Sequence, residues 1–330
     1  MAESTASLGY DDLRKEIGAY LGFGRTTASW STGQADTIAS CLQSGLRQFY
    51  TPPVLQGEMY AHEWSFLRPQ ATMTIWASVQ ENTSVTATGV AGASTTTITA
   101  SVSTFVPSMV GAEIEFNGLT GAYPIVSYTS PTVVVVDGLV PTPATARTFS
   151  IDASGDYRLP DDFAQLDGPI SFSTQQIGGV IQQTGESIIR ERRQEFTGTG
   201  QPTIAAVIPR TLGVVGATAG QRFDLAVFPT PDFNYTVRYR YRVHPNAIAA
   251  SGYPYGGLAH AETILASCLS VAERRVNDRA GEQHVNFLER LRASVSMDRM
   301  GEADTLGYNG DGRGFGYAPD TLITYKGVSY

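Results

Sequence analysis

The residues that could form a catalytic site are few in this sequence, and they do not complete a known motif. His260, Glu262 and Cys268 lie close together in a segment with helical spacing, where an imidazole and a thiolate could bind zinc. A hydrolytic zinc site of this type needs two further cysteines spaced as Cys-x-x-Cys, and the chain contains only Cys41 and Cys268. We therefore interpret these residues as part of a helix and its apolar face.

The other candidate motifs lack the context that their chemistry requires. His62 and Glu63 have no second ligand nearby in the sequence. The glycine-rich segment 310–316 has neither the flanking strand and helix nor the Lys-Ser/Thr pair of a phosphate-binding loop. Asp161 and Asp162 are adjacent at an expected turn, so their carboxylates do not point at one bond. The sequence therefore predicts a protein that is not an enzyme and has no cofactor and no metal site.

The most distinctive charged feature is a row of arginines. In the segment 235–243, aromatic and β-branched residues alternate with Arg238, Arg240 and Arg242, which predicts a strand with one packed face and one charged face. Like charges in a row repel unless solvent or acidic groups screen them. The row is either a solvated strand face or a binding surface for an acidic partner or phosphate, and we predict the second.

Helices are expected near both ends of the chain. The segments 10–22, 32–50, 258–277 and 280–299 have apolar residues at three- and four-residue spacing. Ser31 and Gln34 have the spacing of a capping box at the start of the second segment. Because four apolar stripes each need a partner, we expect the N- and C-terminal helix pairs to form one four-helix bundle.

The sequence between the helix pairs is of the β type. Between Asn82 and Ser150 only four residues are charged, and threonine and valine, which favour strands, dominate. We therefore expect an α+β fold: a four-helix bundle with an intervening β region and an inserted small β-barrel or sandwich module. The expected division is 1–77 for the N-terminal helices and first strand, 78–151 for the inserted β module, 152–256 for the β region of the core, 257–302 for the C-terminal helix pair, and 303–330 for an extended C-terminal arm.

The C-terminal arm combines two compositions. Its first half is rich in glycine, which predicts a mobile tether, and its second half is rich in apolar and aromatic residues. Apolar residues on a free tail would be exposed to water, so we expect them to bind a partner. They could do so, for example, as an added strand at the edge of the partner's sheet. The alternative is that the tail folds back on its own subunit. The candidate binding residues are Phe315, Tyr317, Leu322, Ile323 and Tyr325.

Composition narrows the class of protein. The net charge is −8 and only 16% of residues are charged, which argues against capture of nucleic acid by the overall field of the protein. No apolar run approaches the roughly 20 residues of a membrane span, and the first residues do not resemble a signal peptide. Two cysteines do not make a disulfide framework. We therefore expect a soluble protein without a membrane partner.

Several segments together resemble a tailed-bacteriophage head-to-tail adaptor, or connector. They are LGYDDLRKEIGAYLGFG, QFYTPP, HEWSFLRP, YRLPDDFAQLDGPISF, FDLAVFPTPDFNYTVRYRYRVHP, the helix pair HAETILASCLSVAERRVND and FLERLRASVSMDR, and LGYNGD. The segments FVPSMVGAEIEFNG and YPIVSYTSPTVVVVDG are similar to a β unit of phage neck proteins. The resemblance covers most of the chain and rests on the order of these segments.

The resemblance implies a structural virion protein, made in the host cytoplasm and located in the neck between head and tail. It implies a twelve-subunit homo-oligomeric ring that binds the portal protein, the expected partner of the C-terminal arm, and a tail nozzle, tail tube or terminator protein. Double-stranded DNA would pass through this channel during genome packaging and ejection without sequence-specific contact, and an acidic lumen would limit its binding. Two alternatives remain open: a virion-associated peptidoglycan hydrolase, and a peripheral carbohydrate- or receptor-binding tail component.

Overall fold

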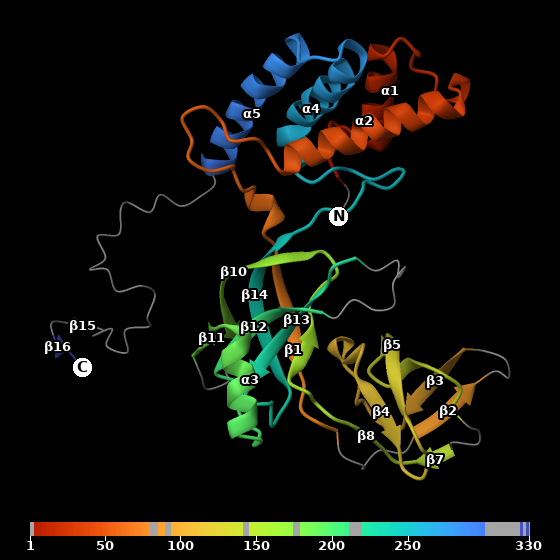
Figure 1. Cartoon of the computed structure of the whole chain (residues 1–330), viewed down its shortest axis with the longest axis vertical. Helices are drawn as coiled ribbons and strands as arrows, with labels where there is room; N and C mark the ends of the chain where they lie inside the picture. Colours follow the sequence, from red (N-terminus) through yellow and green to blue (C-terminus); the bar gives the residue numbers. More distant parts are fainter. Residues whose placement is uncertain are drawn as a thin grey trace.

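The computed structural model places helices at one end of an elongated molecule and β-sheets at the other (Figure 1). It describes residues 3–79, 85–89, 94–140, 145–173, 179–210, 220–300, 324–325 and 328–329. In the part of the chain that is described, no helix combines the length and the apolar character needed to cross a bilayer.

Four helices pack together in one layer. They are α1 (Tyr10–Tyr20), α2 (Thr32–Tyr50), α4 (Gly257–Asn277) and α5 (Glu282–Met300). Helix α4 lies between α2 and α5, and α1 packs against α2 and α4. The predicted stripes meet in a shared core that includes Leu13, Ile17, Ile38, Leu42, Ile264, Phe287 and Leu291.

The predicted capping box at the start of α2 is confirmed. The Ser31 hydroxyl accepts a hydrogen bond from the Gln34 amide at 3.3 Å, and the Gln34 side chain accepts one from the Ser31 amide at 2.8 Å. These two bonds satisfy donors that the first turn of a helix leaves without partners, so the helix begins where the sequence indicated.

The first sheet has seven strands, and β14 lies inside it between β1 and β10. All neighbouring strands are antiparallel except β11 and β12. The strand order is β1 (Gln70–Ile75), β14 (Tyr235–Val243), β10 (Phe163–Phe172), β11 (Val180–Gln183), β12 (Ile204–Pro209), β13 (Phe223–Phe228) and β9 (Asp156–Arg158).

Helix α3 (Glu186–Glu195) covers part of this sheet. The charged sequence of this segment was compatible with either a helix or an edge strand, and it forms a helix. Its buried residue Ile189 packs with Ala206 of β12 and Ala226 of β13 in a small separate apolar cluster.

The second sheet also has seven strands, all antiparallel, and it is built from one continuous stretch of chain. The strand order is β7 (Thr145–Arg147), β2 (Val85–Gly89), β3 (Thr95–Ala100), β6 (Val133–Asp137), β5 (Ala122–Ser130), β4 (Glu113–Phe116) and β8 (Phe149–Ile151). The chain enters and leaves this sheet side by side, because Val79 and Ile151 exchange backbone hydrogen bonds of 2.8 and 3.0 Å.

The two sheets share one hydrophobic core, which is separate from the core of the helices. Trp76, which follows β1, reaches the chain of the second sheet, because its indole donates a 3.3 Å hydrogen bond to the carbonyl of Ser108, between β3 and β4. The Tyr157 hydroxyl donates a 2.6 Å hydrogen bond to the Trp76 carbonyl, and the two rings meet edge to face at 5.7 Å. Both side chains are almost fully buried.

The expected fold class is wrong. The protein is α+β, but two large curved sheets dominate it, and it is not a four-helix bundle that carries a small β module. The physical reason is the pairing of β14 with both β1 and β10, which joins distant segments into one wide sheet. The apolar faces of the strands are buried against one another rather than against the helices.

Candidate functional site

The residues that resembled part of a zinc site are buried in the helical layer. His260 is 5% exposed, and its ring centre lies 5.1 Å from that of Trp64 and 5.3 Å from that of Phe66. Burial lowers the pKa of His260 and raises that of Cys268 to about 12. Both side chains are therefore neutral near pH 7, and the Cys268 thiol is not activated as a nucleophile. Among the described residues, no three His, Cys, Asp or Glu side chains are grouped so that they could hold a metal ion.

The structure divides the arginine row on β14 into three different environments. Arg242 forms a 2.6 Å ion pair with Glu63, and Arg240 lies 3.8 Å from Asp167 on β10. Arg238 is exposed and has no ion pair within the described part of the chain. The opposite face of β14 is buried, as its alternation predicted. Of the three charges, that of Arg238 is the most available to a partner.

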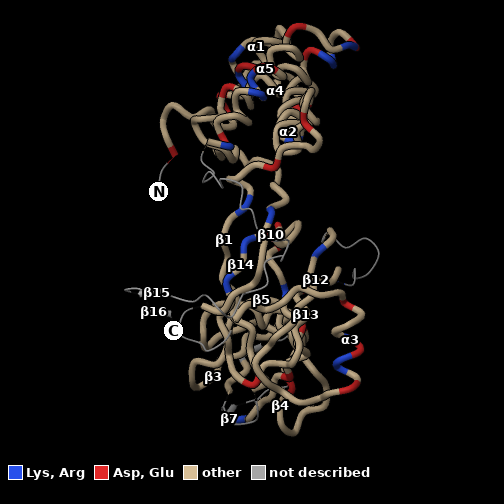
Figure 2. Tube along the Cα trace, turned by 90° about the vertical axis from the view of Figure 1, so that its left-hand side faces the viewer, with Lys and Arg blue, Asp and Glu red and all other residues tan. Residues whose placement is uncertain are grey.

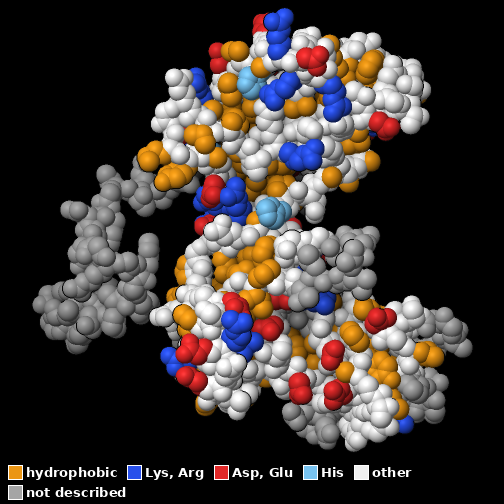
Figure 3. Space-filling model, viewed as in Figure 1, with side chains coloured by type: hydrophobic (Ala, Val, Ile, Leu, Met, Phe, Trp, Pro, Cys, Tyr) orange, Lys and Arg blue, Asp and Glu red, His pale blue; other side chains and the backbone are white. Residues whose placement is uncertain are grey.

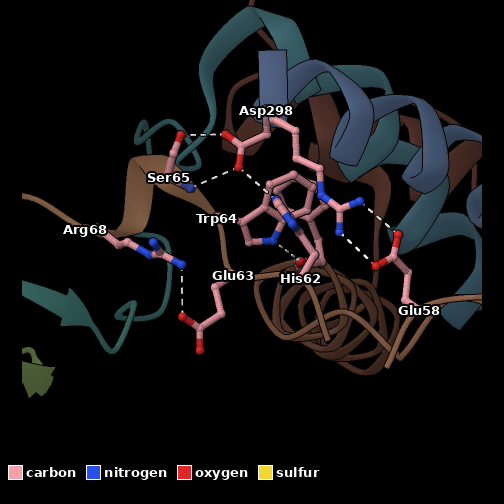
Figure 4. Close-up of polar contacts among 9 residues, drawn as sticks. Glu58, His62, Glu63, Trp64, Ser65, Arg68 and Asp298 are labelled. Carbon is pink, nitrogen blue, oxygen red and sulfur yellow. Dashed lines mark hydrogen bonds and ion pairs between the residues drawn. The ribbon is translucent and has the colours of Figure 1, made fainter. Parts of the chain in front are cut away.

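The helical layer and the first sheet are joined by a narrow junction, formed by the chain segments 51–69 and 244–256 (Figure 2). Asp298, near the end of α5, holds the first of these segments. It accepts hydrogen bonds from His62 Nε2 at 2.8 Å, from the Ser65 amide at 3.0 Å and from the Ser65 hydroxyl at 2.5 Å (Figure 4). Its side chain is 5% exposed. Burial alone would raise the pKa of Asp298, but the hydrogen bonds from Ser65 and His62 outweigh it and lower the pKa.

An aromatic group packs against this carboxylate site. The Trp64 indole donates a 2.7 Å hydrogen bond to the Phe49 carbonyl at the end of α2. The ring of Trp64 stacks on Phe66 and meets the His62 ring edge to face at 4.9 Å. Segment 62–66 is therefore attached to α2 by one contact and to α5 by another (Figure 4).

Two further ion-pair sets lie in the junction, and one of them reaches the sheet. The Glu63 carboxylate binds Arg68, at 2.9 Å, as well as Arg242 of β14. Arg299 of α5 forms two hydrogen bonds of 2.8 and 3.0 Å with Glu58. The Glu63–Arg242 pair therefore ties segment 51–69 to the sheet, and the Arg299–Glu58 pair ties it to α5.

The sequence identified His62 and Glu63 but not their roles. Their partners in the junction, Asp298 and Arg242, lie 236 and 179 residues further along the chain. No local spacing could indicate these pairs. The only local signal of a functional segment was the run His62, Glu63 and Trp64, which lies where the sequence has little helical or strand character.

A cleft of about 490 Å³ lies between the two sheets. Glu113, Glu115 and Asp152 line it together with Arg158, and Asp224 in the same cleft is paired with Arg210 at 2.7 Å. We assign no reaction to this cleft.

The remaining predicted binding residues belong to the C-terminal arm. Phe315, Tyr317, Leu322 and Ile323 lie outside the described residues. Tyr325 is in strand β15 (Thr324–Tyr325), whose backbone pairs antiparallel with β16 (Val328–Ser329). The structure therefore does not bring the arm and the arginine row together into one described site.

No family model matches the chain, and no curated protein matches it.

Proposed function

We propose that this chain is a structural subunit of a phage head-to-tail adaptor ring, which joins the portal to the tail and extends the DNA channel. The observation that carries the proposal is the braced junction between two separate hydrophobic cores. A subunit that links two partners must hold its two ends at a fixed distance and direction. Glu63 links the helical end to the sheet through Arg242 of β14, and Asp298 and Trp64 hold the segment that carries Glu63 against α5 and α2.

In this proposal the two ends of the molecule bind different partners. The arginine row on β14 and the C-terminal arm are the surfaces that contact these partners. Arg238 offers an exposed positive charge on β14, next to the edge strand β1 of the first sheet. Arg240 and Arg242 have acidic neighbours and support its position. The arm would bind the portal through its apolar second half. The net charge of −8 per subunit favours passage of DNA without retention.

The experiment that tests this function is the determination of copy number and position in particles of the phage that encodes the chain. Quantitative mass spectrometry of purified particles gives the copy number, and electron microscopy gives the position. We expect a single ring on the axis of the neck. A peripheral position would overturn the proposal in favour of a receptor-binding component. Lysis of cell-wall substrate by the purified chain, abolished by a single carboxylate substitution, would overturn it in favour of a peptidoglycan hydrolase.

A further inference from the structure

An apolar surface lies beside the C-terminal end of α5. Three large side chains are almost fully exposed there: Met59 at 83%, Tyr60 at 78% and Met300 at 76%. Figure 3 shows hydrophobic side chains gathered at this edge of the helical layer. Apolar side chains that are grouped on a soluble surface indicate a binding site, and methionine adapts well to different partners.

The surface is hollowed in two adjacent places. One hollow, of about 510 Å³, has Leu55 and Val295 among its lining, both nearly buried, and Met300 on its wall. The second, of about 490 Å³, is lined by Met59 and Tyr60. Glu58 and Arg299 line both hollows, so their ion pair stands between them. We call these two hollows the α5 groove. It suits a segment that places apolar side chains on both sides of the Glu58–Arg299 ion pair.

The groove lies where α5 ends, which makes the segment that follows α5 the expected occupant. Helix α5 ends at Met300, on the wall of the first hollow, and 30 residues follow. The last fourteen of them, 317–330, contain the apolar and aromatic part of the arm. A short tether gives a segment an effective concentration of the order of millimolar at a site beside its origin.

Charge supports the same assignment. Arg292 lines the first hollow, is exposed and forms no ion pair with any described residue. The tether 301–316 contains three acidic residues and one arginine, which gives it a net charge of −2. The acidic segment 301–316 therefore begins close to Arg292, whose positive charge has no ion-pair partner among the described residues. The attraction between this segment and Arg292 favours a path of the chain across the groove.

We infer that residues 317–330 bind in the α5 groove of their own subunit when the subunit is free. The arm is then stored on the helical layer, and its apolar residues are protected from water until a partner competes for them. This inference does not depend on the identity of that partner.

Limited trypsin digestion of the full, isolated chain tests the inference, because a bound segment is cleaved only when it opens. The readout is the initial rate of cleavage after Lys326 relative to that after Arg313 in the tether. We compare the wild type with Met59→Ser/Tyr60→Ser/Met300→Ser. The control is Val276→Ser/Val285→Ser, which removes exposed apolar side chains from α4 and α5 outside the groove. We expect the groove variant to raise the relative rate at Lys326 about tenfold and the control to leave it unchanged. Equal rates in all three proteins would overturn the inference.

A cross-linking measurement covers the case in which the groove variant does not fold. Tyr60 is replaced by p-benzoylphenylalanine in the otherwise wild-type chain, which is irradiated and digested. We expect an adduct between position 60 and a peptide from 317–330 within a single subunit. An adduct between two subunits would assign the groove to a second copy and overturn the same-chain arrangement. A chain without an adduct to this segment would overturn the inference. Because no partner is present, failure here is distinct from failure of the proposed function.

Discussion

At the scale of single residues, Asp298 has the largest expected effect on the junction. Its carboxylate is nearly buried, and three donors from segment 62–65 converge on it. A buried carboxylate that loses its donors pays the full cost of desolvation, whereas an exposed ion pair gains little. The junction therefore contains one strong contact at Asp298 and weaker contacts around it.

Substitution Asp298→Asn should destabilise the protein by about 1.5–3 kcal/mol, because hydrogen bonds to a charged group are replaced by weaker neutral ones. The measurement is urea denaturation followed by circular dichroism. Glu58→Gln, which alters the exposed pair with Arg299, is the matched control and should change the midpoint much less. If the two variants had equal midpoints, Asp298 would not hold the junction.

Stability should also depend on His260. Because burial lowers the pKa of this imidazole below its ordinary value of 6.5, the unfolded chain binds a proton that the folded chain does not. Stability therefore falls as the pH decreases below 6.5, with a slope of up to about 1.4 kcal/mol per pH unit from this one group. His260→Phe should flatten the slope between pH 5 and 7 in urea denaturation. His244→Gln, at an exposed position, should keep it. A wild-type slope in the His260→Phe protein would contradict this account.

At the scale of elements, the sequence predicted helices and strands well, because their signals are local. The four long helices lie where the apolar spacing placed them, and strand β14 covers the expected range 235–243. The segment 186–196 was compatible with either a helix or an edge strand because most of its residues are charged or polar. Its choice of a helix depends on the small cluster that it forms with β12 and β13, which no local pattern reveals.

The crossing of α2 and α4 depends on a glycine. A Cβ atom added at Gly45 would lie 2.5 Å from the Cα atom of Cys268, so the two helices would have to separate. We expect Gly45→Ala to destabilise the protein by about 1–3 kcal/mol through overpacking. At Gly33, in the first turn of the same helix, an added Cβ meets nothing within 4 Å. Gly33→Ala should be neutral or stabilise by up to about 1 kcal/mol. Thermal unfolding of both proteins checks the pair, and a similar loss in both would show that helix contact is not the cause.

At the scale of the whole molecule, the sequence did not predict which elements share a core. A stripe at helical spacing shows that a helix has a partner, and alternation shows that a strand has one, but neither identifies the partner. Strand β14 pairs with β1, about 160 residues earlier, and Arg242 pairs with Glu63. These distant contacts make the first sheet a large unit with its own core and make the junction rigid. For the same reason, the arginine row could be predicted as one charged face but not as three different environments.

The last prediction concerns assembly, where the three arginines should no longer act alike. Arg238 is the exposed member without an ion pair among the described residues, so its charge is available to an acidic surface of a neighbouring subunit or partner. Arg238→Gln should leave the monomer as stable as the wild type and weaken ring formation, measured by sedimentation velocity.

Salt separates this effect from a loss of folding. Screening weakens a charge contact in the wild type as the ionic strength rises, so the variant should differ most at low salt and approach the wild type near 1 M, where the Debye length is about 3 Å. Arg190→Gln is the control, because Arg190 is also exposed, lies on α3 and has Glu186 at 3.6 Å. Arg242→Gln should instead lower the stability of the monomer, since Arg242 contacts Glu63 in the junction. Assembly of the Arg238→Gln protein that equals the wild type at every salt concentration would show that the charged face of β14 is only solvated.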